Sequence, residues 1–206
     1  MDGVFMKKMI SFLLFSILFV SIFYVFSCYQ DKVQLRREVI RLHVVANSDT
    51  EADQAQKLRV RDAVNAYLMD LLENANSADD ARKVISSHLT ELEATAKDVL
   101  KAEGSDFAVH ATLTEETFDV REYDTFTLPS GVYSSLRIEL GAAEGRNWWC
   151  VVFPALCLPA AGENIQDVTT AAGFSEGLSG GITGKYQFRF FVLDLLGQAE
   201  KFFFNQ

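Results

Sequence analysis

The sequence predicts an α/β (α+β) domain with a mixed sheet, preceded by an apolar N-terminal segment, and three observations support this prediction. Residues 9–29 contain no charged side chain. Between residues 38 and 104, an apolar β-rich run is followed by two stretches with apolar residues at helical spacing. From residue 106 the apolar period shortens to about two, as in strands. The expected order is β-α-α-β-β-β-β, in which the two helices form an αα-hairpin on the sheet.

Residues 1–29 are predicted to be a signal peptide or a membrane anchor. Lys7 and Lys8 precede an apolar run that is long enough to cross a bilayer, for which about 20 residues suffice. Residues 25–27, just before Cys28, offer a small-residue cleavage site and faintly resemble a lipobox, although the aromatic residue among them is a poor match. A cleaved signal, an uncleaved anchor and a lipoprotein all stay open. In each case the lysines hold the N-terminus inside, so the rest of the chain is expected outside the cytoplasm.

The remaining chain divides by composition into four parts. Residues 30–37 are charged and are expected to form an exposed connector, and residues 38–158 form the globular domain. Residues 159–185 are dominated by Gly, Ala, Ser and Thr, which favours a flexible loop. Residues 186–206 are aromatic and apolar at helical spacing, and they are expected to form an amphipathic C-terminal segment. That segment either docks on the core or contacts a membrane or a partner.

The first strand and the first helix are predicted at residues 38–46 and 48–73. Ser48 and Glu51 match the S-x-x-E capping box, and Asp49 lies at the positive end of the helix dipole. The core-facing side of the helix is marked by apolar residues at helical spacing, namely Val60, Val64, Tyr67 and Leu71.

The second helix is predicted to run from a Ser77 cap to Gly104, and four strands follow it. Ser77 precedes Asp80 by three residues, and Gly104 is a typical helix stop. The strands are predicted at residues 107–114, 117–127, 132–140 and 147–153. Residues 128–131 are Leu-Pro-Ser-Gly, which suits a turn, and Pro154 closes the last strand.

The charge of the chain argues against nucleic-acid binding. The net charge is −9 at pH 7, and the first 28 residues carry +1, so the remainder carries −10. A domain this acidic is a poor nucleic-acid binder, because the phosphate backbone attracts clustered Lys and Arg. The charge suits a domain outside the cytoplasm that does not adhere to anionic lipid.

His43 is the candidate for acid–base chemistry, and neither a metal nor a cofactor is predicted. His43 could act as a general base with Asp49 or Asp53 orienting it, but a lone histidine on a strand is more often structural. His88 and His110 show no ligand spacing, and the three cysteines form no C-x-x-C pair. No glycine-rich phosphate loop occurs either.

A row of charged residues follows one face of the first predicted helix. Asp49, Asp53, Lys57 and Arg61 recur every four residues. Two readings stay open for this row: a solvated series of i, i+4 pairs, or a stripe that contacts a partner.

Two cysteines and two tryptophans lie near the last predicted strand. Cys150 and Cys157 are close enough in sequence to form a disulfide outside the cytoplasm, or they are two buried thiols. Trp148 and Trp149 point to opposite faces of the strand, so one is expected in the core. The other is a candidate interface anchor.

The most specific features of the sequence are motifs that occur in order between residues 38 and 158. The first is Val-Ile-Arg-Leu-His-Val-Val-Ala-Asn-Ser-Asp at 39–49, followed by Asp-Gln at 53–54 and Val-Arg-Asp-Ala-Val at 60–64. Later come Arg-Glu-Tyr at 121–123, Leu-Pro-Ser-Gly-Val-Tyr at 128–133 and Asn-Trp-Trp-Cys-Val-Val-Phe-Pro-Ala-Leu-Cys at 147–157. Together they resemble the stage II sporulation protein R family, whose members are secreted signalling proteins of endospore-forming bacteria and are not known as enzymes.

The resemblance implies a role in communication between two cells. The protein would be made in the forespore and exported to the space between the two membranes. There it would activate a membrane-embedded aspartic protease of the mother cell, by contact with the extracytoplasmic part of that protease. The protease then removes the pro-segment of a mother-cell sigma factor. The residues expected at the contact are His43, Asn47, Asp49, Asp53, Lys57, Arg61, Arg121 and Trp149.

The alternative function is an exported hydrolase that acts on cell-wall material. It would use His43 as the base and Asp49 as its orienting group. The hydrolase predicts that the purified domain alone is active on peptidoglycan or ester substrates and that His43→Ala abolishes this activity.

Overall fold

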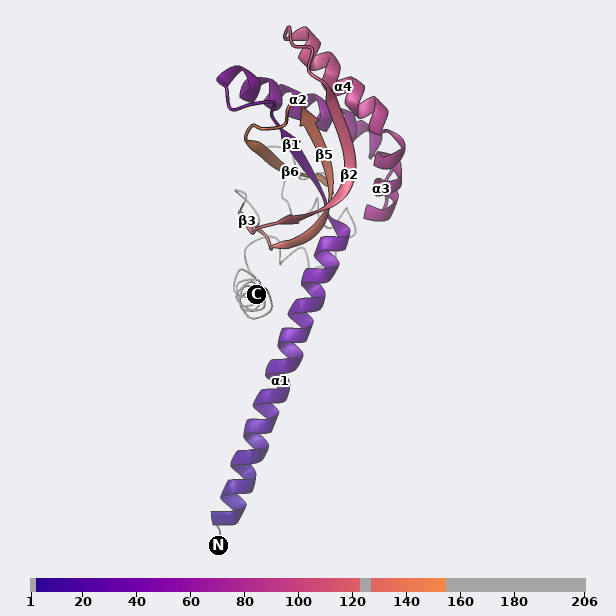
Figure 1. The fold of residues 1–206 in the computed structure, drawn as a ribbon. Helices are drawn as coiled ribbons and strands as arrows, with labels where there is room; N and C mark the ends of the chain where they lie inside the picture. The colour runs from indigo at the N-terminus through magenta and orange to yellow at the C-terminus, as the bar shows by residue number, and fades with distance from the viewer. Residues whose placement is uncertain (1–2, 123–126, 155–206) are drawn as a thin grey trace, which may run out of the picture.

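The computed structural model describes residues 3–122 and 127–154 (Figure 1). Its helices are α1 (Gly3–Glu38), α2 (Glu51–Leu71), α3 (Ala78–Ser87) and α4 (Leu89–Ala102). Its strands are β1 (Ile40–Val45), β2 (Val109–Phe118), β3 (Arg121–Glu122), β4 (Thr127–Leu128), β5 (Gly131–Leu140) and β6 (Asn147–Phe153). The predicted loop at 159–185, the predicted segment at 186–206 and Cys157 lie outside the described residues.

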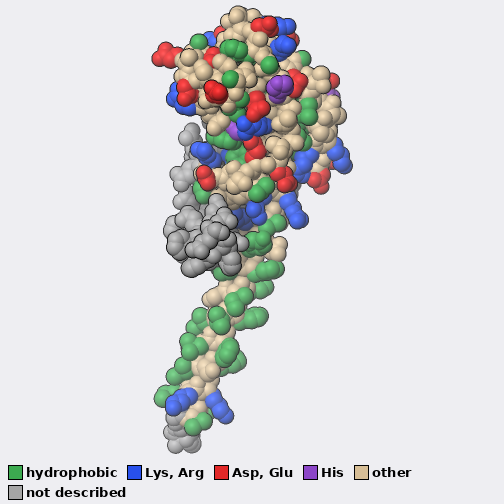
Figure 2. Space-filling view, in the orientation of Figure 1, with side chains coloured by type: hydrophobic (Ala, Val, Ile, Leu, Met, Phe, Trp, Pro, Cys, Tyr) green, Lys and Arg blue, Asp and Glu red, His purple; other side chains and the backbone are tan. Residues whose placement is uncertain are grey.

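Helix α1 projects from the domain as one long helix (Figure 1). Hydrophobic side chains surround its projecting part, whereas charged side chains are spread over the domain (Figure 2). Its most apolar 18-residue stretch has a mean hydropathy of 2.5, so the helix is long and apolar enough to cross a membrane. A signal sequence meets the same requirement, so the helix fits either a signal or an anchor.

The end of α1 belongs to the domain, so the expected exposed connector at residues 30–37 is wrong. No Gly or Pro interrupts residues 4–38, and the helix continues to Glu38. Leu35 is only 1% exposed, and the buried Lys32 donates to the Ser130 hydroxyl at 3.4 Å. Arg82 of α3 donates to the carbonyl oxygen of Arg37. These contacts attach the helix firmly to the domain.

The main sheet is mixed, as predicted, and has the strand order β2-β5-β1-β6. β1 runs parallel to β5, while the β1–β6 and β2–β5 pairs are antiparallel. Leu42 of β1 lies between Leu136 of β5 and Cys150 of β6 in the register. Side chains from this face pack with α2, α3 and α4 into the hydrophobic core. The described part of the chain is therefore an α/β domain with helices against one face of a sheet (Figure 1).

The predicted second helix is in fact two helices, α3 and α4, that meet at His88. The Ser77 cap is confirmed, because its hydroxyl accepts from the backbone N–H of Asp80 at 3.1 Å. His88 has non-helical backbone angles (φ −120°, ψ 22°), and its Nδ1 lies 2.8 Å from the carbonyl oxygen of Val84. The imidazole thus takes over a carbonyl that a continuing helix would pair with a backbone N–H.

The two strands predicted at 107–114 and 117–127 are mainly one strand, β2. It pairs with β5 continuously from Val109 opposite Leu140 to Phe118 opposite Gly131. The two adjacent glutamates, Glu115 and Glu116, lie within the strand and point to opposite faces. β3 and β4 form a separate two-stranded sheet. The strands predicted at 132–140 and 147–153 are confirmed as β5 and β6.

Candidate functional site

The structure divides the predicted site residues between two places. Along β1, Leu42 and Val44 point into the helix-covered core, so His43 points to the other face of the sheet. We call one group the polar corner, which consists of Asn47, Ser48, Asp49, Asp53, Lys57 and Arg146. We call the other the sheet-face cluster, which consists of His43, Glu116, Arg137, Asn147 and Trp149.

Helix α2 begins at the polar corner, and its N-cap residue differs from the predicted one. Thr50 is the N-cap residue, and its hydroxyl accepts from the backbone N–H of Asp53 at 3.2 Å. The Ser48–Glu51 capping box is therefore wrong. Ser48 instead donates its hydroxyl proton to the Asp53 carboxylate at 2.5 Å, and the Asn47 amide donates to the same oxygen at 2.8 Å. These hydrogen bonds lower the pKa of Asp53.

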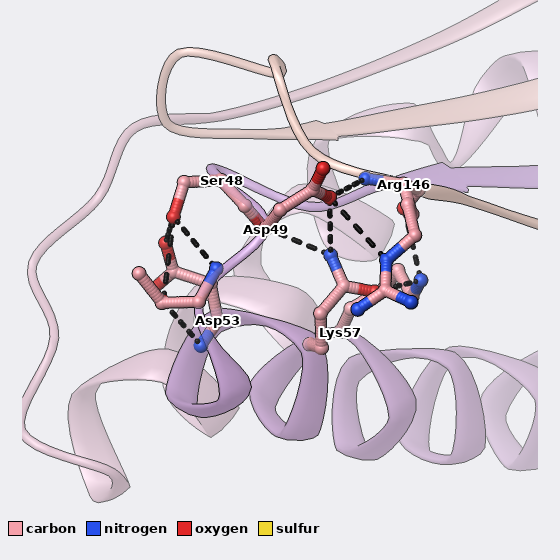
Figure 3. A network of polar contacts seen from close by, with 7 residues as sticks. Ser48, Asp49, Asp53, Lys57 and Arg146 are labelled. Carbon is pink, nitrogen blue, oxygen red and sulfur yellow. Dashed lines mark hydrogen bonds and ion pairs between the residues drawn. The ribbon is translucent and has the colours of Figure 1, made fainter.

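The corner also joins the β1–α2 connection to the loop between β5 and β6. The Asp49 carboxylate accepts from the backbone N–H of Arg146 at 2.7 Å (Figure 3), and the Asn47 side-chain oxygen accepts from Ala142 at 2.9 Å. A Cβ atom on Gly145 would collide with the Ser48 carbonyl oxygen, so this close approach requires glycine. The polar side chains therefore hold two loops together.

The charged row of Asp49, Asp53, Lys57 and Arg61 is not a solvated series of i, i+4 pairs. Lys57 is 4% exposed, and its ammonium donates to Gln54 at 2.6 Å and to the Arg146 carbonyl at 2.9 Å. Burial lowers the pKa of Lys57. Arg61 pairs with Asp62 and lies over the Trp148 ring, 4.2 Å from its centroid. The row is therefore used within the domain, and Asp49 is its most exposed member.

The sheet-face cluster is built around His43. Its Nδ1 lies 3.0 and 3.1 Å from the two carboxylate oxygens of Glu116 on β2, and its Nε2 lies 2.9 Å from Oδ1 of Asn147 on β6. The ring of Trp149 stacks on the imidazole at 3.6 Å between centroids. The predicted contact between His43 and Asp49 is absent, because Asp49 lies in the polar corner with Arg146.

At neutral pH, burial favours a neutral His43 and hydrogen bonds favour an ionised Glu116. Burial lowers the pKa of His43, and the hydrogen bonds with Asn147 and Glu116 offset this only in part. Burial alone would raise the pKa of Glu116, but hydrogen bonds led by those from Ser135 and Arg137 outweigh it and lower the pKa. Arg137 reaches Glu116 at 2.8 Å. Both imidazole nitrogens face protein groups, so this arrangement is unsuited to general base catalysis.

Sequence reasoning missed several members of this face. Arg41 was not a candidate, and it is completely buried, with its guanidinium 3.9 Å from the Phe118 ring centroid. Arg121, which was a candidate, lies 5.7 Å from the Trp149 centroid. Glu116, Arg137 and Asn147 were not candidates, since they come from three separate strands. One signal was present, because Arg137 and Glu139 alternate with apolar residues along β5 and had to share a face.

The described residues do not form a metal site, and the disulfide stays a prediction. Within residues 3–122 and 127–154, no group of three or more His, Cys, Asp or Glu side chains could hold a metal ion. Cys150 lies on β6 against the hydrophobic core. Its predicted partner, Cys157, is outside the described residues.

The tryptophans divide as predicted between the two faces of β6. Trp148 packs against the hydrophobic core with Arg61 over its ring. Trp149 is half-buried between His43 and Phe118, with their ring centroids at 3.6 and 5.0 Å. Its remaining exposed edge is the aromatic surface that this face offers.

Comparison with known proteins gives one family and one curated relative. The sequence profile of "Stage II sporulation protein R" matches residues 36–163. A protein of Bacillus subtilis (strain 168) named "Stage II sporulation protein R" is 38% identical over 120 residues, which are 58% of this chain and 54% of the relative. The chain thus spans about half the length of the curated relative that it matches. No solved structure matches the chain.

Proposed function

Because the chain belongs to the stage II sporulation protein R family, we propose that it is an exported sporulation signal that acts by binding and not by catalysis. Its target is the extracytoplasmic part of a membrane-embedded aspartic protease in the mother cell. Activation of this protease leads to processing of the mother-cell pro-sigma factor. The family match carries this proposal, and the engagement of both His43 nitrogens supports it.

The proposed location is the space between the forespore and mother-cell membranes. Helix α1 supports export, because it is long and apolar enough to serve as a signal or an anchor. Lys7 and Lys8 precede the apolar run and favour an N-terminus on the cytoplasmic side. The acidic domain then lies beyond the membrane.

A ligand activates a receptor only when it binds the active state more tightly than the inactive one. A rigid domain suits this task, since a fixed surface can discriminate between two receptor states. The polar corner supplies such rigidity by joining two loops. Lys57 and Asp53 then act by positioning the surface rather than by touching the partner.

We place the centre of the contact at Trp149 and Arg121. Trp149 is held by stacking on His43, and Arg121 is exposed beside it. Tryptophan and arginine are enriched among residues that dominate binding energy, especially where packing fixes their orientation. His43 contributes indirectly, because it fixes the plane of the indole.

Gene deletion with complementation tests the proposed function. Deleting the gene in its spore-forming host should stop processing of the pro-sigma factor, and the wild-type gene should restore it. Trp149→Ala should restore processing poorly while the protein accumulates normally. Trp148→Phe is the matched control on the opposite face of β6, and it should restore processing. Normal processing in the deletion strain would refute the function, whereas full rescue by Trp149→Ala would refute only the contact surface.

A direct assay separates signalling from hydrolysis. Purified full-length protein in detergent should co-purify with the extracytoplasmic part of the protease and should leave peptidoglycan intact. Release of peptidoglycan fragments by the wild type, and its loss in His43→Ala, would contradict action by binding alone.

A further inference from the structure

One edge of the main sheet is formed by β2. Among the residues that the structure describes, β2 is last in the strand order and pairs only with β5, which leaves backbone groups on its outer side unpaired. In an antiparallel strand, alternate residues turn their N–H and C=O groups toward the neighbour or away from it. The Ala108 carbonyl accepts from the N–H of Gly141 and so faces β5, whereas the N–H of Ala111 donates to the Glu93 carboxylate at 2.8 Å and faces away.

Residues two positions apart in a strand turn their backbone N–H and C=O groups in the same direction, so the orientation of Ala111 applies to every second residue after it. Leu113, Glu115 and Thr117 must also turn their backbone groups away from β5. Within residues 3–122 and 127–154, no side chain or backbone group accepts a hydrogen bond from these three N–H groups. Among the described residues, Glu93 of α4 therefore covers the first part of the edge, and none pairs with the edge at residues 113–118.

The open stretch lacks several of the features that protect edges from pairing, although Glu115 and Glu116 place charge on it. Residues 113–118 contain no Lys, Pro or Gly, and their register with β5 shows no bulge. The side chains of Glu115 and Thr117 are exposed, so no helix packs over this part of the strand. Six extended residues span about 20 Å, which is the length of an ordinary strand.

Charge indicates what kind of segment fits there. β2 contains neither Lys nor Arg, and Glu115 and Asp119 are exposed along this edge. Glu116, by contrast, is already paired with Arg137 on the sheet face. A strand added at this edge therefore meets unneutralised carboxylates, and basic side chains on that strand would be favoured.

We propose that residues 113–118 of β2 pair with an extended segment of the partner protein that carries Lys or Arg opposite Glu115. This rests on the proposed function, and it adds a backbone docking site to the contact at Trp149. Pairing at an exposed edge is a common mode of peptide recognition, in which main-chain hydrogen bonds provide affinity and side chains provide specificity.

Substitutions at Glu115 separate the backbone contribution from that of the charge. Glu115→Pro removes an outward N–H but no hydrogen bond to β5, whereas Glu115→Ala removes the charge and keeps the N–H. Binding of the full-length protein in detergent to the purified extracytoplasmic part of the protease should weaken about tenfold or more in Glu115→Pro. Glu115→Ala should weaken it by only about twofold, and Glu115→Lys by more than Glu115→Ala.

Amide hydrogen exchange of the wild type provides a readout that does not depend on how the proline variant folds. Adding the protease fragment should slow exchange at Leu113, Glu115 and Thr117. Unchanged exchange at these amides despite binding, or wild-type affinity of a folded Glu115→Pro variant, overturns the edge proposal and leaves the proposed function intact. Absence of any wild-type binding counts against both. Slowed exchange that depends only on protein concentration assigns the edge to a second copy of the chain and also overturns the proposal.

Discussion

The polar corner and the sheet-face cluster both contain charged residues, but they are built in different ways. In the corner, several side chains bond to backbone groups and so join two loops, and Asp49 and Arg146 stay largely exposed. In the cluster, side chains bond to one another across several strands around His43, which is only 3% exposed. The same residue types thus hold two loops together in the corner and form a polar network around His43 in the cluster.

The difference between the two groups lies in sequence separation. Most of the corner lies within residues 47–57 and is completed by Arg146. The cluster combines His43 with Glu116 and Asn147, which are 73 and 104 positions away. A local group can be recognised from a motif, whereas a group assembled by the sheet depends on the strand order and register.

Glu116→Ala should cause the largest loss of stability and would test the buried network directly. The carboxylate contacts both Arg137 and His43, so its removal leaves partly buried groups without their acceptor. We expect the free energy of unfolding to fall by about 3 kcal/mol, measured by urea denaturation of the full-length protein in detergent. Glu115→Ala, next to it but exposed, is the control and should cost less than about 0.5 kcal/mol. Equal losses would contradict the difference between the two faces of β2.

Asp53→Ala should have the next largest effect, because the polar corner loses a charged acceptor. Asp53 accepts from Ser48 and Asn47 and lies in the first turn of α2. The expected loss is about 1–2 kcal/mol in the same unfolding measurement. Asp49→Ala is the matched variant at a largely exposed position, and it should cost less than Asp53→Ala. The reverse order would mean that the Arg146 contact, and not the start of α2, holds the corner together.

Sequence reasoning found the elements whose signals are local. The strands at β5 and β6, the Ser77 cap and the apolar N-terminal helix all follow from neighbouring residues. The mixed sheet also follows, because a helical hairpin separates the first strand from the later ones. The break at His88 was not predictable in this way, since a side chain replaces a backbone donor there.

The candidate site shows the same limit. His43 and Trp149 were recognised, but their partners Glu116, Arg137 and Asn147 come from the pairing of β1 with β5 and β6 and of β5 with β2. The charged row on α2 was found by its spacing of four residues, yet Lys57 is buried by a loop that lies 89 positions away. Periodicity identifies a face of a helix, and only the fold shows what covers it.

Acid should weaken the sheet-face cluster before it affects the polar corner. Burial lowers the pKa of folded His43 below 6.5, so the unfolded chain binds a proton more readily. The contribution of neutral His43 to the free energy of unfolding is fully present above about pH 6.5. It is lost as the pH falls from there toward the pKa of His43 in the folded protein. Between pH 7.5 and 5.5 the free energy of unfolding should therefore decrease.

The pH experiment needs a histidine control. His43→Gln should remove this part of the pH dependence, while His110→Gln, which changes an exposed histidine, should keep it. An unchanged slope in His43→Gln would assign the acid sensitivity to other groups. Asp53 and Glu116 have lowered pKa values, so their contributions are lost only at more acidic pH.

Arg61→Met should have the smallest effect, and it tests whether the row on α2 acts as one unit. Methionine keeps most of the apolar stem and removes the cation over the Trp148 ring, so the expected loss is about 0.5–1 kcal/mol. Asp53 lies two turns earlier on the helix and contacts none of the same groups. The losses in the Asp53→Ala, Arg61→Met double variant should therefore add to within about 0.5 kcal/mol. A larger coupling would mean that the spacing of four residues reflects one connected network, and the separation of the corner from the rest of α2 would have to be abandoned.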